Sequence, residues 1–100
     1  MSAQTRNQVI HTNGFVGTTA VVALATSTFN TTNFFMIINN AASGGNSLAY
    51  TLDGSTPTIN GSGITLQPGG SSTWDAFVPV GGVITVIGSA ANTPYCITTG

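Results

Sequence analysis

The sequence has 100 residues, which is enough for one domain with a small core. Only 3% of the residues are charged, against about 25% in a typical soluble domain, and the formal net charge is -1. This composition excludes binding to a nucleic-acid backbone and a polybasic membrane anchor, because both need several Lys or Arg side chains. The hydrophobic fraction of 41% excludes an intrinsically disordered chain.

Residues 1–17 are polar and have no clear hydrophobic period, so we expect an extended N-terminal arm there. Its apolar residues Val9, Ile10 and Phe15 are candidate contacts with other subunits, and Val9 with Ile10 also fits a short strand. Arg6, the only cation of the chain, is either a solvated arm residue or an anchor in an interface, where Arg is enriched. The arm lacks the apolar core of a signal peptide, so we expect a protein that is made in a cytosol and either stays there or leaves by another route such as lysis.

From residue 18 onward, strand signals alternate with turn signals rich in Gly and Pro. Strands are expected over residues 18–28, 33–39, 47–52, 64–67, 72–78, 83–89 and 94–99. The run 33–39 is almost continuously apolar, which predicts a strand buried on both faces. Turns are expected at Asp53-Gly54 and at Gln67-Pro68-Gly69-Gly70, where Gly supplies a positive φ.

These signals predict an all-β fold: a single antiparallel β-sandwich or jelly-roll-like domain of seven or eight strands over residues 18–100. A sandwich and a closed barrel remain alternatives at this point. Helix content should be near zero, because Lys and Glu are absent and Gln is rare. The longest apolar runs, residues 20–25 and 34–38, are far shorter than the roughly 18 residues that a membrane span needs.

The residues that could carry chemistry are few: His11, Asp53, Asp75 and Cys96. They form no motif for a nucleophile, a phosphate loop or a metal site, so we expect no enzymatic activity, no cofactor and no bound metal. A single cysteine cannot form an internal disulfide. Trp74 is expected in the core, with a subunit contact as the alternative.

Several segments together resemble small structural proteins of tailed bacteriophages. They are the run 33–38, a Ser-Leu-Ala-Tyr strand, Gly63-Ile64-Thr65-Leu66-Gln67-Pro68-Gly69, Trp74 and the segment 78–84 (VPVGGVI). The resemblance covers about residues 33–98. It implies a β-sandwich virion component, foremost a decoration (cement) protein on the capsid exterior, assembled in the host cytoplasm. Its partners would be the major capsid protein or other virion proteins and copies of itself, with no nucleic acid, no membrane and no catalytic residues.

Other functions stay open. A tail, collar or head–tail joining component would need the same uncharged, all-β chain. A carbohydrate- or host-binding module would need exposed aromatic rings, for which Tyr50, Trp74 and Tyr95 are the candidates. An ice- or crystal-binding surface would need regular threonine ladders, but the Thr-x-Thr pairs of this chain follow no fixed period.

Overall fold

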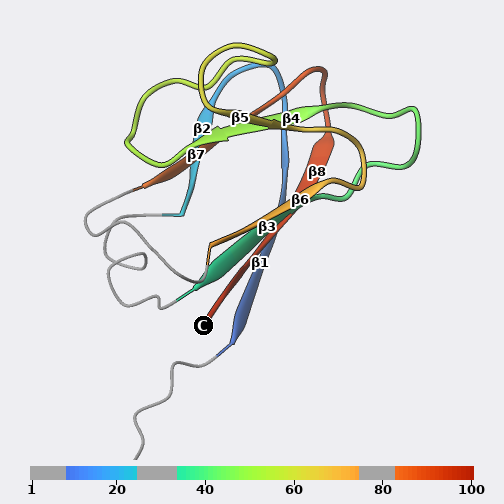
Figure 1. Cartoon of the computed structure of the whole chain (residues 1–100). Helices are drawn as coiled ribbons and strands as arrows, with labels where there is room; N and C mark the ends of the chain where they lie inside the picture. Colours follow the sequence, from blue (N-terminus) through green and yellow to red (C-terminus); the bar gives the residue numbers. More distant parts are fainter. Residues whose placement is uncertain (1–8, 25–33, 75–82) are drawn as a thin grey trace, which may run out of the picture.

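The computed structural model describes residues 9–24, 34–74 and 83–100, and their only regular elements are β-strands (Figure 1). The predicted all-β class is therefore confirmed for these ranges. The strands are β1 (Ile10–Val16), β2 (Val21–Leu24), β3 (Phe35–Asn39), β4 (Leu48–Thr51), β5 (Ile64–Leu66), β6 (Ser71–Trp74), β7 (Ile84–Gly88) and β8 (Thr93–Thr99).

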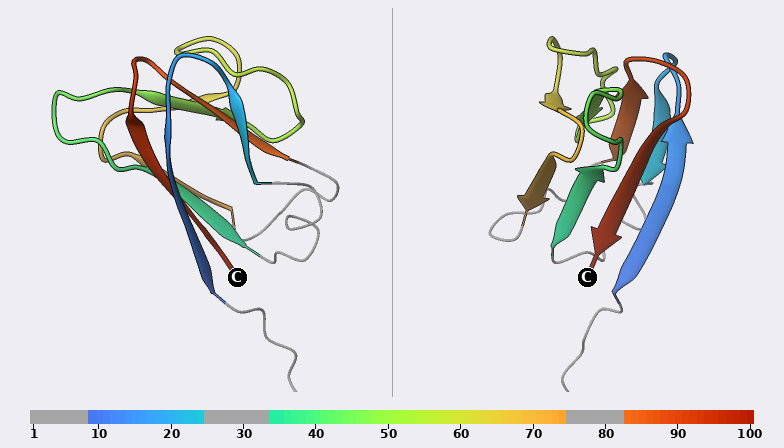
Figure 2. Two further views of the ribbon diagram at one scale, coloured as in Figure 1. Left: turned by 180° about the vertical axis from the view of Figure 1, so that it is seen from behind. Right: turned by 90° about the vertical axis from the view of Figure 1, so that its right-hand side faces the viewer.

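The strands form two four-stranded antiparallel sheets, ordered β1-β8-β3-β6 and β2-β7-β4-β5. Four of the pairs are nested: β1 with β8, β2 with β7, β3 with β6 and β4 with β5. The chain is thus one long hairpin rolled around itself, which is the jelly-roll arrangement. Figure 2 shows the two sheets from two sides, with β1 at the margin of its sheet next to β8.

The core lies between the inner faces of the two sheets. In β3, Phe35 and Ile37 are buried while Met36 and Ile38 are half-buried, as expected for a strand with one face inward. The prediction of a strand buried on both faces is therefore wrong for this run. The buried apolar side chains are Val16, Leu24, Phe35, Ile37, Leu48, Tyr50, Leu66, Ile84, Val86, Tyr95 and Ile97. Each fully buried large side chain contributes about 1.5–3 kcal/mol to folding.

One side-chain network connects the two sheets. The buried Tyr50 hydroxyl of β4 donates a hydrogen bond to Ser72 Oγ of β6 at 2.7 Å. The same hydroxyl accepts one from Trp74 Nε1 at 3.0 Å. Trp74 also stacks on Phe35, with ring centroids 5.9 Å apart, and is half-buried against the core. The indole therefore belongs to the core, as the sequence predicts.

The two predicted turns have the expected geometry. Gly69 has a φ of 79°, and the Gly70 N–H donates to the Gln67 carbonyl at an N···O distance of 2.7 Å. Pro68 before a glycine of positive φ is typical of a type II turn. Gly54, which follows Asp53, has a φ of 81°.

The N-terminal segment differs from the predicted arm. Residues 10–16 form β1, which pairs with β8 over its whole length from Ile10 opposite Thr99 to Val16 opposite Thr93. The boundary of the sandwich therefore lies before residue 10 and not at residue 17. The hydrophobic period is hidden because the inward positions include Thr12 and Gly14, and Gly14 lies against the ring of Tyr95. Arg6, Asp75 and the expected strand ends at 25–28 and 75–78 lie outside the described residues.

The outer faces of the two sheets are covered differently. In the β2-β7-β4-β5 sheet, Ala49, Thr51 and Thr85 are on the outer face, yet all three are buried. The loop over residues 52–63 covers this face and is bonded to it, since Thr51 Oγ1 donates to the Ser55 carbonyl at 2.6 Å. No described segment covers the outer face of the β1-β8-β3-β6 sheet to the same degree, because Met36, Ile38 and Cys96 remain half-exposed there.

Candidate functional site

The most exposed apolar side chains of the described residues gather on the first two strands. We call this surface the β1–β2 margin; it consists of Val9, Ile10, Phe15, Val21 and Val22. Phe15 is 72% exposed, Val22 61% and Val9 58%. β1 and β2 are edge strands of their respective sheets and lie on the same side of the sandwich (Figure 2).

Three of the four predicted contact residues lie on this margin. Val9, Ile10 and Phe15 are exposed, and Arg6 is outside the described residues. They do not share one face, because Ile10 and Phe15 are separated by an odd number of positions along a strand and point to opposite sides. Sequence reasoning missed Val21 and Val22, which it placed in an ordinary strand. Two adjacent valines at the start of that strand are the only signal that could have identified them.

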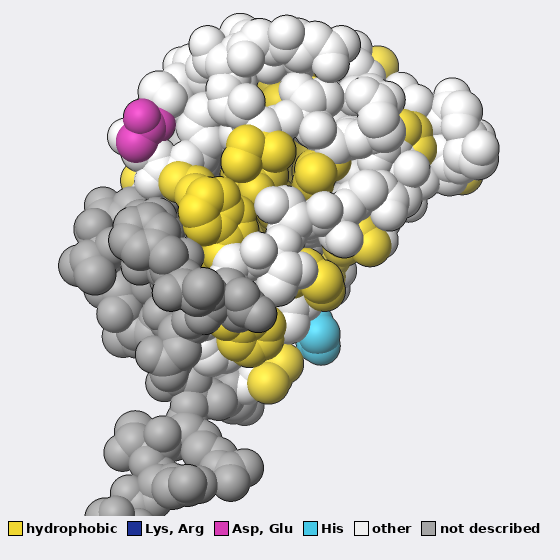
Figure 3. Space-filling model, in the orientation of Figure 1, with side chains coloured by type: hydrophobic (Ala, Val, Ile, Leu, Met, Phe, Trp, Pro, Cys, Tyr) yellow, Lys and Arg dark blue, Asp and Glu magenta, His cyan; other side chains and the backbone are white. Residues whose placement is uncertain are grey.

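The outer face of the β1-β8-β3-β6 sheet continues the margin. Phe15 lies opposite Pro94, and Asn13 lies opposite Cys96, which lies opposite Ile38 on the next strand. Half-buried apolar side chains thus extend from the edge toward the middle of the sheet. Figure 3 shows hydrophobic side chains at the surface beside the only histidine, coloured cyan.

His11 is held on this face by a neighbouring strand. Its Nδ1 lies 2.8 Å from Thr98 Oγ1, and the two atoms share a hydrogen bond. The partner residue is a neutral hydroxyl, so His11 contributes a polar group and no fixed ion pair. No Lys, Arg, Asp or Glu occurs between residues 9 and 24, and the described part of the margin is therefore uncharged.

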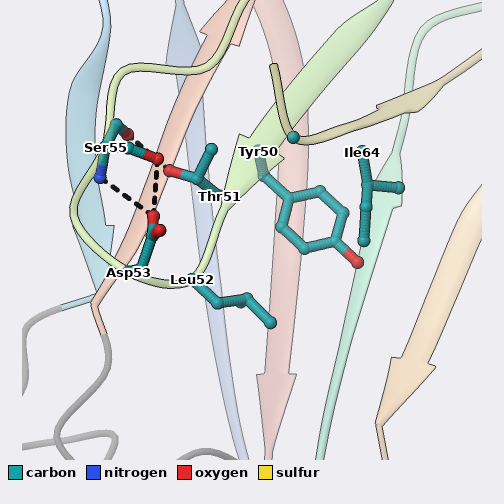
Figure 4. A pocket seen from close by; sticks show the side chains of 7 residues that line it. Tyr50, Thr51, Leu52, Asp53, Ser55 and Ile64 are labelled. Carbon is teal, nitrogen blue, oxygen red and sulfur yellow. Dashed lines mark hydrogen bonds between the residues drawn. The ribbon is translucent and has the colours of Figure 1, made fainter. Parts of the chain in front are cut away.

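A shallow pocket of about 300 Å³ lies between the end of β4 and the start of β5 (Figure 4). Its lining residues are Tyr50, Thr51, Leu52, Asp53, Ser55, Gly63 and Ile64. Asp53 Oδ1 accepts hydrogen bonds from the Ser55 hydroxyl and from the Ser55 N–H, the latter at 3.1 Å. These two bonds hold the pKa of Asp53 below its usual value of 3.8, and the bond from the Ser55 hydroxyl has the larger effect.

The bonds to Ser55 make Asp53 a turn residue. Asp side chains commonly accept a hydrogen bond from the backbone two residues further on, and such a bond closes a turn. The Ser55 hydroxyl is bonded to Asp53, but apart from the buried phenol of Tyr50 no other titratable group lines the pocket. Among the described residues, no group of three or more His, Cys, Asp or Glu side chains could hold a metal ion.

The aromatic rings considered for carbohydrate binding are engaged elsewhere. Tyr50 is fully buried, and Tyr95 is 8% exposed, so neither offers a ring face to a sugar. Burial also raises the pKa of Tyr95 above its usual value of 10.0, which keeps the phenol neutral. One face of Trp74 stacks on Phe35.

Comparison with known proteins assigns no family to the chain. No protein-family profile matches the sequence, and no curated protein sequence matches it. The described ranges contain no helix long and apolar enough to cross a membrane. The β1–β2 margin is the largest group of exposed apolar side chains among the described residues, and we take it as the candidate site.

Proposed function

We propose that this chain is a non-enzymatic structural protein of a virion, and that it is a decoration protein on the capsid of a tailed bacteriophage. The observation that carries the proposal is the β1–β2 margin, where five exposed apolar side chains lie on or beside two edge strands without a charge. Exposed apolar residues on edge strands are normally avoided, because they promote association with other chains. Contact with another protein would remove this apolar surface from water, which favours association.

The architecture supports the proposal as an analogy. Eight-stranded jelly rolls occur in viral capsid domains, although also in lectins and cupins, so the fold alone does not decide the function. The low charge adds to the analogy. A chain with 3% charged residues has little electrostatic repulsion to keep free copies apart, which suits a protein that works packed among identical neighbours.

The mechanism that we propose is burial of the margin in joints between subunits of the head. Each joint would be weak, but it would be repeated over the lattice, so that many small contacts together stabilise the shell. Arg6, which precedes the margin in the chain, is proposed as a further contact in the same joint. Because the margin is uncharged, its binding should change little with salt concentration.

The test is binding to heads that lack the protein, prepared from the phage that encodes this chain. We expect the purified protein to cosediment with such heads and to raise the temperature at which they rupture. Phe15→Ser and Val22→Ser should weaken binding at least about tenfold, since each removes a large exposed apolar contact. Ile64→Ser is the matched control, because Ile64 is 38% exposed on the edge strand β5, away from the margin.

Three results would refute parts of the proposal. Virions that contain the chain only in tails or collars would assign it to the other class of virion component. Virions without the chain would exclude a virion role altogether. Equal binding by Phe15→Ser, Val22→Ser and Ile64→Ser would show that the margin is not the contact surface.

A further inference from the structure

The outer edge of β1 presents unpaired backbone groups, and the bonds of β8 identify them. Phe34 and Gly100 exchange two backbone hydrogen bonds between β3 and β8, with N···O distances of 3.1 and 3.2 Å. Hydrogen-bonded and non-hydrogen-bonded pairs alternate along an antiparallel pair of strands. The next residue of β8, Thr99, therefore directs its N–H and C=O toward β1, and so do Ile97 and Tyr95.

The register carries this alternation to the edge. The residues opposite Thr99, Ile97 and Tyr95 are the even-numbered ones of β1, which therefore bond to β8. The N–H and C=O groups of His11, Asn13 and Phe15 point away from the sheet. None of these groups bonds to another residue in the part of the chain that the structure describes.

β1 is also the least protected of the edge strands. It has seven residues and an unbroken register, whereas β2 has four residues and a register shift between Val22 and Leu24. β5 has only three residues, and β6 has four in the described range. Natural sheets protect their edges with short strands, bulges, Pro or Lys, and β1 contains none of these.

We propose that β1 pairs antiparallel with β1 of a second copy of this chain, so that two four-stranded sheets join into one. Full overlap of Ile10–Val16 with itself places Asn13 opposite Asn13 of the second copy, on a two-fold axis. His11 then lies opposite Phe15 of the second copy. All three residues have outward N–H and C=O groups, so every pair formed at these positions exchanges two backbone hydrogen bonds.

A second copy is the occupant that the charge pattern favours. Residues 9–17 contain no Asp, Glu, Lys or Arg, so two copies of the strand meet without repulsion and a charged partner strand finds no counterion. An antiparallel strand pair is also self-complementary, as an isologous interface requires. The pairing covers Phe15, the most exposed apolar side chain of the margin, with the His11 ring of the second copy. The inference rests on the proposed assembly role, and it identifies a second copy of this chain as one partner in that assembly.

The first experiment measures the mass of the isolated full-length protein by sedimentation and light scattering over a range of concentrations. We expect a dimer for the wild type and for Asn13→Ser, which keeps the backbone N–H. Asn13→Pro should raise the dissociation constant at least about tenfold, because it removes an outward N–H while every β1–β8 bond remains. A monomeric wild type, or a dimer that Asn13→Pro does not weaken, overturns the proposal.

The second experiment tests the register and does not depend on Asn13→Pro folding. Asn13→Cys is made together with Cys96→Ser, because Asn13 and Cys96 are opposite each other and the two thiols would otherwise react within one chain. Mild oxidation should yield a covalent dimer, since Cα atoms of a hydrogen-bonded pair are about 5.5 Å apart, within the range of a disulfide. The matched control is Thr73→Cys combined with Cys96→Ser. Thr73 is exposed on β6, away from β1, so this variant should not form a crosslinked dimer.

Equal crosslinking of the two variants overturns the proposed register and with it the inference. Both experiments use purified protein without any capsid. A failed dimer with intact head binding would refute the inference alone, whereas a dimer that does not bind heads would refute only the proposed function.

Discussion

The Tyr50 hydroxyl is one of the polar contacts between the two sheets of the sandwich, and Tyr50→Phe removes it without changing the ring. The substitution deletes the bond to Ser72 Oγ at 2.7 Å and the bond from Trp74 Nε1 at 3.0 Å. A net hydrogen bond contributes about 0.5–1.5 kcal/mol, so the loss should be about 2 kcal/mol. For a domain of this size, that lowers Tm by about 8–16 °C.

The assay is urea and thermal unfolding followed by the fluorescence of Trp74, the only tryptophan. Tyr95→Phe is the matched control, because Tyr95 is similarly buried and its hydroxyl bonds to no other described residue. We expect this control to change the free energy of unfolding by less than about 0.5 kcal/mol. A double-mutant cycle with Ser72→Ala should show a coupling of about 0.5–1.5 kcal/mol between the two hydroxyls.

The reasoning is refuted if Tyr50→Phe destabilises the protein no more than Tyr95→Phe does. It is also refuted if Ser72→Ala has the same effect in the wild type as in the Tyr50→Phe variant, because the two side chains would then act independently. A change in the m-value between variants would instead indicate an altered unfolded state, so the double-mutant cycle is calculated from variants with the same m-value.

Three further predictions concern the turns and the buried polar groups. Gly63→Ala should destabilise the fold by about 2–5 kcal/mol, and Gly69→Ala by only about 1–2 kcal/mol. Both glycines have a positive φ, but a Cβ at residue 63 meets the backbone, whereas one at residue 69 meets open space. Equal losses of Tm in the two variants would contradict this account. Asn39→Ala should lower the free energy of unfolding in urea by about 2–4 kcal/mol, because this buried amide donates hydrogen bonds to two carbonyls and accepts one from an N–H. Asn40 is exposed, and Asn40→Ala should change the free energy of unfolding by less than about 0.5 kcal/mol. Because the pKa of Asp53 is lowered in the folded state, the ionised carboxylate stabilises the fold above about pH 3.8, and this contribution is lost as the pH falls through the pKa of the folded protein. Between about pH 5 and pH 2, the Tm of the wild type should therefore fall more than that of Asp53→Asn. Parallel Tm curves would argue against the Ser55 bonds.

The fold class was predictable from the sequence because local rules decide it. β-branched runs and Gly-Pro punctuation depend only on neighbouring residues, and the turn at Pro68-Gly69 formed where the sequence places it. The strand order was not predictable, because it depends on pairs such as Ile10 with Thr99 that no local pattern specifies.

The candidate site was predictable only in part. Val9, Ile10 and Phe15 are recognisable as apolar residues in a polar segment. The sequence predicts an arm over residues 1–17, however, whereas residues 10–16 form an edge strand. The missing signal is a hydrophobic alternation: the inward position Gly14 is filled by the ring of Tyr95 from the neighbouring strand, so β1 needs no large side chain there. Part of the inward face is thus supplied by a residue near the other end of the chain.

The nested pairing of the strands also dictates when the molecule can fold during its synthesis. Only β4 and β5 are partners close in sequence, joined by residues 52–63, whereas each pair further out closes a longer loop. We expect the β1–β8 pair to form last, and its full register cannot form before residue 99 has left the ribosome. Folding should therefore be slow, on the order of milliseconds to seconds, as for other chains dominated by distant contacts. Until that final pairing, both edges of β1 are open, and nascent chains on one messenger are vulnerable to pairing with each other.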